Sequence, residues 1–98
     1  MKDSYEFEVI CKNAIIEYYN SKAEITDNFK IGIKDVYVVW MCKTLQNSKA
    51  LLSTTANDGM YYELTYNGDK EELYLDAYKK WENKLITKDK FKNTVDNT

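Results

Sequence analysis

The first regular pattern along the chain is a helical stripe between residues 4 and 20. Its apolar residues recur three or four positions apart: Phe7, Ile10, Cys11, Ala14, Ile15 and Tyr18. Ser4 stands where a helix N-cap is expected, because its hydroxyl can accept a hydrogen bond from a free backbone N–H of the first turn. The pattern predicts an amphipathic helix whose apolar side faces a core.

Three stretches with the composition of strands follow a loop that we expect at 22–34. β-Branched and aromatic residues are frequent at 35–44, 49–55 and 60–66. Polar residues separate these stretches at 46–48 and 56–59, where tight turns are expected. The spacing predicts three consecutive antiparallel strands that form a meander.

Helical spacing returns between residue 69 and about residue 83. Asp69 can cap a helix at its start. An apolar stripe follows it: Tyr74, Ala77, Tyr78, Trp81 and Leu85. The predicted fold class is therefore α+β, a two-layer α-β-β-β-α domain in which both helices pack on a three-stranded antiparallel meander. We assign residues 1–86 to this single domain and expect the polar residues 87–98 to form a frayed C-terminal tail.

Alternation along the predicted strands assigns each side chain to one face of the sheet. Trp40, Leu52, Tyr62 and Leu64 are expected to face the helices. The opposite face is then lined by Tyr37, Val39, Met41, Leu51, Ser53, Tyr61 and Glu63, with the turn residues Asn57 and Asp58 at its rim. A bare apolar sheet face is usually covered by a partner, so these nine residues are the candidate partner-binding site. Two alternatives are that the 22–34 loop or the C-terminal tail covers this face, or that the two faces are exchanged.

The composition excludes several kinds of chemistry. All 14 basic residues are lysine, and the chain has no histidine or arginine. It therefore lacks an imidazole for metal binding or nucleophile activation, and a guanidinium for bidentate phosphate recognition. Glu71, Glu72 and Asp76 are close together, but with Lys79 and Lys80 beside them they are typical of a solvated helix face. We expect no catalytic residue, metal or cofactor, and a protein that is not an enzyme.

The cysteines and the hydropathy profile bear on the compartment. Cys11 and Cys42 fall inside predicted elements and match no metal-ligand spacing, so both are expected to be buried free thiols in a reducing cytoplasm. No stretch approaches the roughly 18 consecutive apolar residues of a membrane span, and residues 1–4 are not followed by the apolar region of a signal peptide. We expect neither secretion nor a membrane span.

Nucleic-acid binding is disfavoured by charge. The predicted order of one helix, three strands and one helix is also that of double-stranded RNA-binding domains, whose second helix begins with basic residues that contact phosphates. Here residues 69–72 read Asp-Lys-Glu-Glu, and the net charge of the chain is −2. Stacking of bases on an aromatic sheet face remains an alternative.

Two runs, KTLQNSKALLSTT and DGMYYELTYNGDK, carry a resemblance to a known family. Over residues 5–86 the chain resembles a family of short uncharacterised proteins encoded by phages and prophages of low-GC Gram-positive bacteria. That family has no assigned activity, so no residue inherits a role from it. The resemblance implies a phage or mobile-element accessory protein that acts inside a bacterial cell.

The function expected from these observations is binding. We expect an accessory protein that binds and modulates a host protein, with inhibition of a bacterial defence system such as a CRISPR effector as the specific candidate. The first alternative is a nucleic-acid-binding module that uses the aromatic sheet face. The second is a homodimeric structural protein that buries this face on a second copy of itself.

Overall fold

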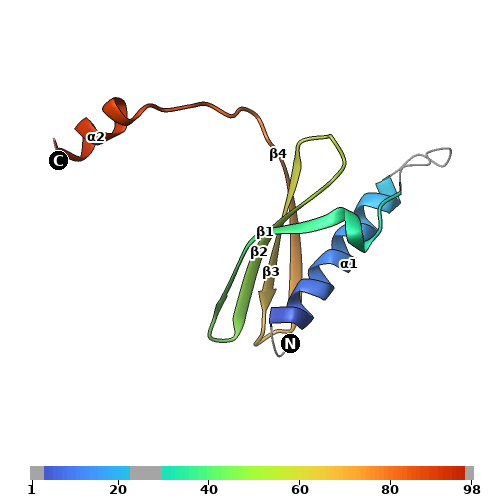
Figure 1. Cartoon of the computed structure of the whole chain (residues 1–98). Helices are drawn as coiled ribbons and strands as arrows, with labels where there is room; N and C mark the ends of the chain where they lie inside the picture. Colours follow the sequence, from blue (N-terminus) through green and yellow to red (C-terminus); the bar gives the residue numbers. More distant parts are fainter. Residues whose placement is uncertain (1–3, 23–29, 97–98) are drawn as a thin grey trace.

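The computed structural model describes residues 4–22 and 30–96 (Figure 1). Its elements, in chain order, are α1 (Ser4–Lys22), the short 3-10 helix η1 (Ile33–Asp35), β1 (Val36–Thr44), β2 (Asn47–Thr54), β3 (Met60–Asn67), β4 (Glu72–Lys79) and α2 (Lys88–Asp96). The four strands are antiparallel and lie in the order β1-β2-β3-β4. The α+β class is confirmed, but the sheet has four strands where the sequence pattern predicted three.

The core lies between α1 and one face of the sheet (Figure 1). Phe7, Cys11 and Ile15 are four residues apart and form the buried stripe of α1. They pack on the buried sheet residues Val36, Ala50, Leu52, Tyr62 and Leu64. The predicted amphipathic helix is thus present, and its apolar side faces the sheet.

Side-chain hydrogen bonds fix the start of β1 against α1. The side-chain oxygen of Asn20, in the last turn of α1, accepts a hydrogen bond from the Ile31 N–H at 3.0 Å, and its amide nitrogen donates to the Ile31 carbonyl at 3.1 Å. The Asp35 carboxylate accepts from the Gly32 N–H at 2.8 Å. The contacts of Asn20 hold the segment that leads into β1 against the end of α1, and that of Asp35 closes the turn at η1. The rest of the loop expected at 22–34 includes 23–29, which lie outside the described residues.

The prediction of a second helix at 69–83 is wrong, because residues 72–79 form the strand β4. The strand pairs with β3 over its whole length, from Asn67 opposite Glu72 to Met60 opposite Lys79. Leu73 and Leu75 alternate with Tyr74 and face α1, where both pack against the core. A spacing of two therefore describes this stretch, and the Tyr74, Ala77, Tyr78 stripe matched helical spacing by coincidence.

A β-bulge in β1 makes the predicted assignment of side chains to the two sheet faces wrong for the second half of this strand. The register passes from Val38 opposite Leu52 to Trp40 opposite Leu51, so Val39 is an extra residue without a partner on β2. Beyond the bulge the alternation is reversed: Met41 packs against the core, and Trp40 lies on the other face. The same reversal exposes Cys42, which was expected to be a buried thiol, whereas Cys11 is buried as predicted.

The chain beyond β4 leaves the sheet. Residues 80–87 form an extended segment, and α2 follows at a distance from the strands (Figure 1). The radius of gyration is 17.0 Å, whereas a compact chain of this length has roughly 13 Å. Among the described residues, no helix has the length and apolar character needed to cross a membrane. The assignment of 1–86 to one domain and of 87–98 to a frayed tail stays a prediction.

Candidate functional site

The strand register defines the sheet face that points away from α1, which we call the open face. Four rows of residues cross it from β1 to β4: Tyr37, Ser53, Tyr61 and Tyr78; Trp40, Leu51, Glu63 and Asp76; Cys42, Lys49, Thr65 and Tyr74; and Thr44, Asn47, Asn67 and Glu72. Successive side chains of a strand point to opposite faces. The strand residues between these four rows therefore point toward α1, where the core lies.

Large aromatic side chains are exposed on the open face. Tyr37 is 47% exposed, Trp40 43%, Tyr74 55% and Tyr78 52%. Leu51 and Tyr61 lie between them and are half-buried. Within the described part of the chain, α1 lies on the other face of the sheet and α2 lies away from the strands (Figure 1). The open face is therefore an aromatic surface on a rigid sheet.

Carboxylates lie among these aromatic rings. The central Glu63 accepts a hydrogen bond from the Tyr78 hydroxyl at 3.4 Å and forms an ion pair with Lys49 at 3.6 Å. Asp76 lies directly opposite Glu63 on β4, and Glu72 stands four residues before it. The four rows of the open face thus carry three carboxylates against one lysine, which gives these rows an acidic character.

These carboxylates also act on the neighbouring tyrosines. The negative charge of Glu63, and after it that of Asp76, raises the pKa of Tyr78 above its usual value. The Tyr74 hydroxyl donates to Glu72 at 2.9 Å, and this hydrogen bond raises the pKa of Tyr74. Both hydroxyls therefore stay protonated at neutral pH, and each donates its hydrogen to a carboxylate of the same face.

Two shallow hollows lie at the ends of the open face. One, of about 410 Å³, is lined by Leu51, Tyr61, Tyr78, Lys79 and Lys80. The other, of about 320 Å³, is lined by Trp40, Cys42, Thr44, Asn47, Ser48, Lys49 and Thr65. Each places an aromatic ring beside a lysine side chain. Hollows of this kind accept apolar side chains of a bound polypeptide.

The structure brings together five of the nine residues predicted for partner binding. Tyr37, Leu51, Ser53, Tyr61 and Glu63 lie in two adjacent rows of the open face. Ser53 among them is buried, and its hydroxyl donates to the Met60 carbonyl at 2.8 Å. Met41 is placed in the core, contrary to the prediction, and Val39 is the bulge residue. That any of these residues binds a partner stays a prediction.

Among the aromatic and acidic residues of the open face, sequence reasoning missed five: Trp40, Glu72, Tyr74, Asp76 and Tyr78. Trp40 was assigned to the helix face because the bulge at Val39 gives no signal in a strand that is apolar on both sides. The other four were assigned to a helix. The signal that identifies them is the strict alternation of Leu73, Leu75 and Ala77 with polar or tyrosine residues.

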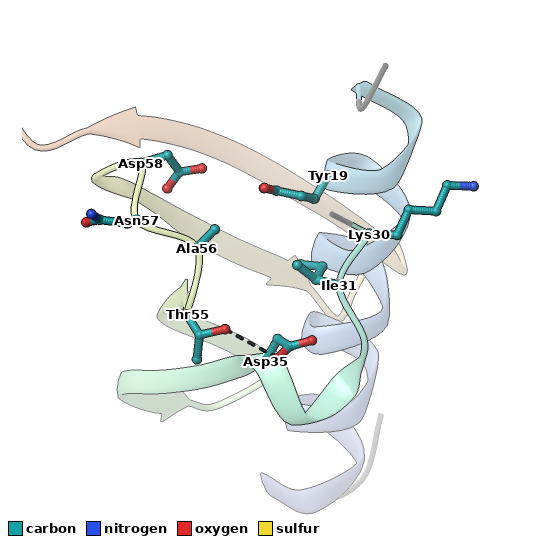
Figure 2. Close-up of a pocket in the computed structure, with 8 residues that line it drawn as sticks. All are labelled: Tyr19, Lys30, Ile31, Asp35, Thr55, Ala56, Asn57 and Asp58. Atoms are coloured by element: carbon teal, nitrogen blue, oxygen red, sulfur yellow. Dashed lines mark hydrogen bonds between the residues drawn. The ribbon is translucent and has the colours of Figure 1, made fainter. Parts of the chain in front are cut away.

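A third hollow lies away from the open face, beside the C-terminal end of α1, and contains Asn57 and Asp58 (Figure 2). It measures about 470 Å³ and is also lined by Tyr19, Lys30, Ile31, Asp35, Thr55 and Ala56. Figure 2 shows Tyr19 pointing across the hollow toward Asp58, while Lys30 points outward. The two predicted rim residues are therefore not grouped with the other seven.

The carboxylates of this third hollow hold the local backbone. Asp35 accepts hydrogen bonds from the Gly32 N–H and, at 3.3 Å, from the Thr55 hydroxyl (Figure 2). Asp58 accepts from the Met60 N–H at 3.1 Å. In the described ranges 4–22 and 30–96, no three side chains of histidine, cysteine, aspartate or glutamate gather in a way that can hold a metal ion.

Comparison with known proteins places the chain in a family. The sequence profile of a family of unknown function (DUF6275) matches residues 8–88. This match extends from α1 to the start of α2 and includes the whole sheet. No curated protein and no solved structure gives a significant match. Because the profile covers most of the chain, the protein belongs to this family of unknown function.

Proposed function

We propose that the protein acts by binding and not by catalysis, and that its open face takes a protein partner. The observation that supports this proposal is the group of exposed aromatic residues Tyr37, Trp40, Tyr74 and Tyr78 on one rigid sheet face. Tyrosine and tryptophan are enriched in the cores of protein interfaces, where they bury a large area and lose little conformational entropy.

The charge of the open face favours a basic partner. Glu63, Asp76 and Glu72 stand among the rings, and Lys49 is the one lysine in the four rows. Phosphate groups are repelled by such a surface, which argues against the nucleic-acid alternative. A lysine- or arginine-rich polypeptide surface gains ion pairs there and buries its apolar stems on the rings.

We further propose a host protein of the bacterial cytoplasm as the partner. The phage and prophage context implied by the sequence resemblance supports this choice. The specific candidate is a nucleic-acid-binding defence effector such as a CRISPR effector, because such a protein has a basic channel and the open face presents three carboxylates to it. Occupation of the channel would inhibit the effector.

Affinity capture from a lysate of a low-GC Gram-positive bacterium tests the proposal. The wild-type chain is compared with a Tyr37→Ala/Tyr78→Ala variant and with the matched control Tyr5→Ala, which removes an exposed tyrosine of α1. We expect the control to retain the protein captured by the wild type, and the double variant to lose at least 90% of it, as roughly expected from removing two interface residues. Equal capture by all three chains contradicts the proposed site.

A further inference from the structure

The C-terminal arm, which we define as residues 80–96, exposes more apolar surface than a free segment of a folded protein normally does. Trp81 is 94% exposed and Leu85 86% exposed, and Ile86 and Phe91 are also exposed. These four residues give the arm an apolar stripe that contacts no core. Exposed apolar groups on this scale are typical of a segment that docks on another surface.

The arm and the open face are complementary in charge. The arm carries five lysines and three acidic residues, whereas residues 1–79 carry nine lysines and thirteen acidic residues. On the open face the carboxylates of Glu63, Asp76 and Glu72 outnumber Lys49. A net positive arm with apolar side chains therefore fits an acidic aromatic face in both respects.

The direction of the arm favours the face of another molecule over its own. The Lys80 N–H still donates to the Gly59 carbonyl at 2.8 Å, so the arm starts in line with β4. From there residues 81–87 run away from the sheet (Figure 1). A return to the same sheet needs a tight reversal, and Asn83 is the one residue between 81 and 87 of the kinds that dominate tight turns.

We propose that two copies of the chain exchange their C-terminal arms, each arm docking on the open face of the other copy. This inference rests on the proposed function, because it assigns an occupant to the same protein-binding face. Four large apolar side chains per arm, at roughly 150 Å² each, give on the order of 1,200 Å² for two arms before the covered face is counted. That area is within the range of specific interfaces. A host protein would then compete with the arm for the face.

The first test is the mass of the full chain in solution by light scattering, which is independent of shape. We expect about twice the monomer mass of 11.6 kDa. The arm variant Trp81→Ser/Leu85→Ser and the face variant Tyr37→Ser/Trp40→Ser are each expected to dissociate at least tenfold more readily. Asn83→Ser and Tyr5→Ser are the matched controls and are expected to remain dimeric. Circular dichroism checks that every variant is folded.

The second test mixes the two variants, with one of them isotopically labelled so that native mass spectrometry distinguishes the chains. The arm variant retains an intact face, and the face variant retains an intact arm, so the mixture can form a heterodimer with one docked arm. We expect heterodimers in the mixture and monomers in each variant alone.

Three results overturn the arm exchange. They are a monomeric wild type, an arm variant that stays fully dimeric, and a mixture without heterodimers. A monomeric wild type that still captures a host protein through Tyr37 and Tyr78 leaves the proposed function intact. A dimer whose capture of host proteins is insensitive to those residues supports the exchange and contradicts the host partner.

Discussion

Cys11 and Cys42 occupy opposite environments although both lie within regular elements. Cys11 is fully buried on the side of α1 that faces the sheet, and burial, together with the nearby charge of Glu8, raises the pKa of its thiol from 9.0 to about 12. Cys42 lies on the open face and is exposed. The buried thiol therefore packs as a small apolar group and is unreactive at neutral pH, whereas the exposed thiol is accessible to reagents.

The raised pKa of Cys11 predicts an alkaline loss of stability. Below pH 9 the thiol is neutral in both the folded and the unfolded chain. Between pH 9 and about 12 the unfolded chain loses this proton first, so the free energy of unfolding falls as the pH rises. Urea titrations at pH 8, 9, 10 and 11 measure the fall, to which this thiol contributes on the order of 2 kcal/mol by pH 11.

Two alanine variants isolate the contribution of this thiol. Cys11→Ala is expected to show a shallower alkaline fall than the wild type, even if its stability at pH 8 is lower because of the lost core volume. Cys42→Ala serves as the matched control, because it removes a cysteine while the buried thiol of Cys11 stays in place. Parallel pH profiles for all three chains would show that Cys11 ionises alike in the folded and unfolded states.

At the scale of elements, the sequence pattern predicted the secondary structure correctly where the residues fit only one periodicity. The stripe of Phe7, Cys11 and Ile15 predicted α1, and β-branched and aromatic residues predicted β1, β2 and β3. It failed at β4 because Tyr74, Ala77 and Tyr78 fit a helical period while Leu73 and Leu75 fit a period of two. The pairing of β4 with β3, a tertiary contact, decides between them.

Alanine substitutions in β4 distinguish the strand from the helix. Leu75 faces the core and Tyr74 faces solvent, so Leu75→Ala is expected to lower the free energy of unfolding by about 2 kcal/mol and Tyr74→Ala by less than about 1 kcal/mol. A helix with the Tyr74, Ala77 and Tyr78 stripe buried requires the opposite order. Urea denaturation of the two variants gives the answer.

Because of the bulge at Val39, only part of the candidate site could be predicted from the sequence. Tyr37, Leu51, Tyr61 and Glu63 were assigned to the correct face by alternation. Met41 and Trp40 were exchanged, because both faces of β1 are apolar and no polar residue marks the extra position. A one-residue change in register moves every later side chain of a strand to the other face.

Deletion of Val39 tests the bulge directly. Because this residue has no partner on β2, its removal leaves Trp40 on the open face and Met41 in the core. We expect the shortened chain to fold cooperatively and to lose no more than about 2 kcal/mol. Deletion of Leu51 from the central strand β2 is the matched control, and it should abolish cooperative unfolding. Loss of cooperative unfolding in the Val39 variant would indicate a regular, unbulged β1.

On the scale of the whole molecule, residues 1–79 and the C-terminal arm differ in both net charge and shape. Residues 1–79 are acidic and contain the packed sheet, whereas the arm is basic, exposes large apolar side chains and leaves the sheet. The radius of gyration of 17.0 Å reflects this division. An acidic aromatic face and a basic apolar arm in one chain are consistent with a protein that works through contacts with other polypeptides.

Site-specific photo-cross-linking in bacterial cells tests most directly whether the open face binds a polypeptide. A photoreactive benzoylphenylalanine replaces Tyr37 on the open face in one chain, and Tyr5 on the exposed side of α1 in the control. Both positions are exposed tyrosines, so each substitution preserves an aromatic ring and the core. We predict a discrete cross-linked polypeptide, either a second copy or a host protein, from position 37 and none from position 5. Equal cross-linking from both positions, or none from position 37, would contradict the proposal that the open face binds a polypeptide.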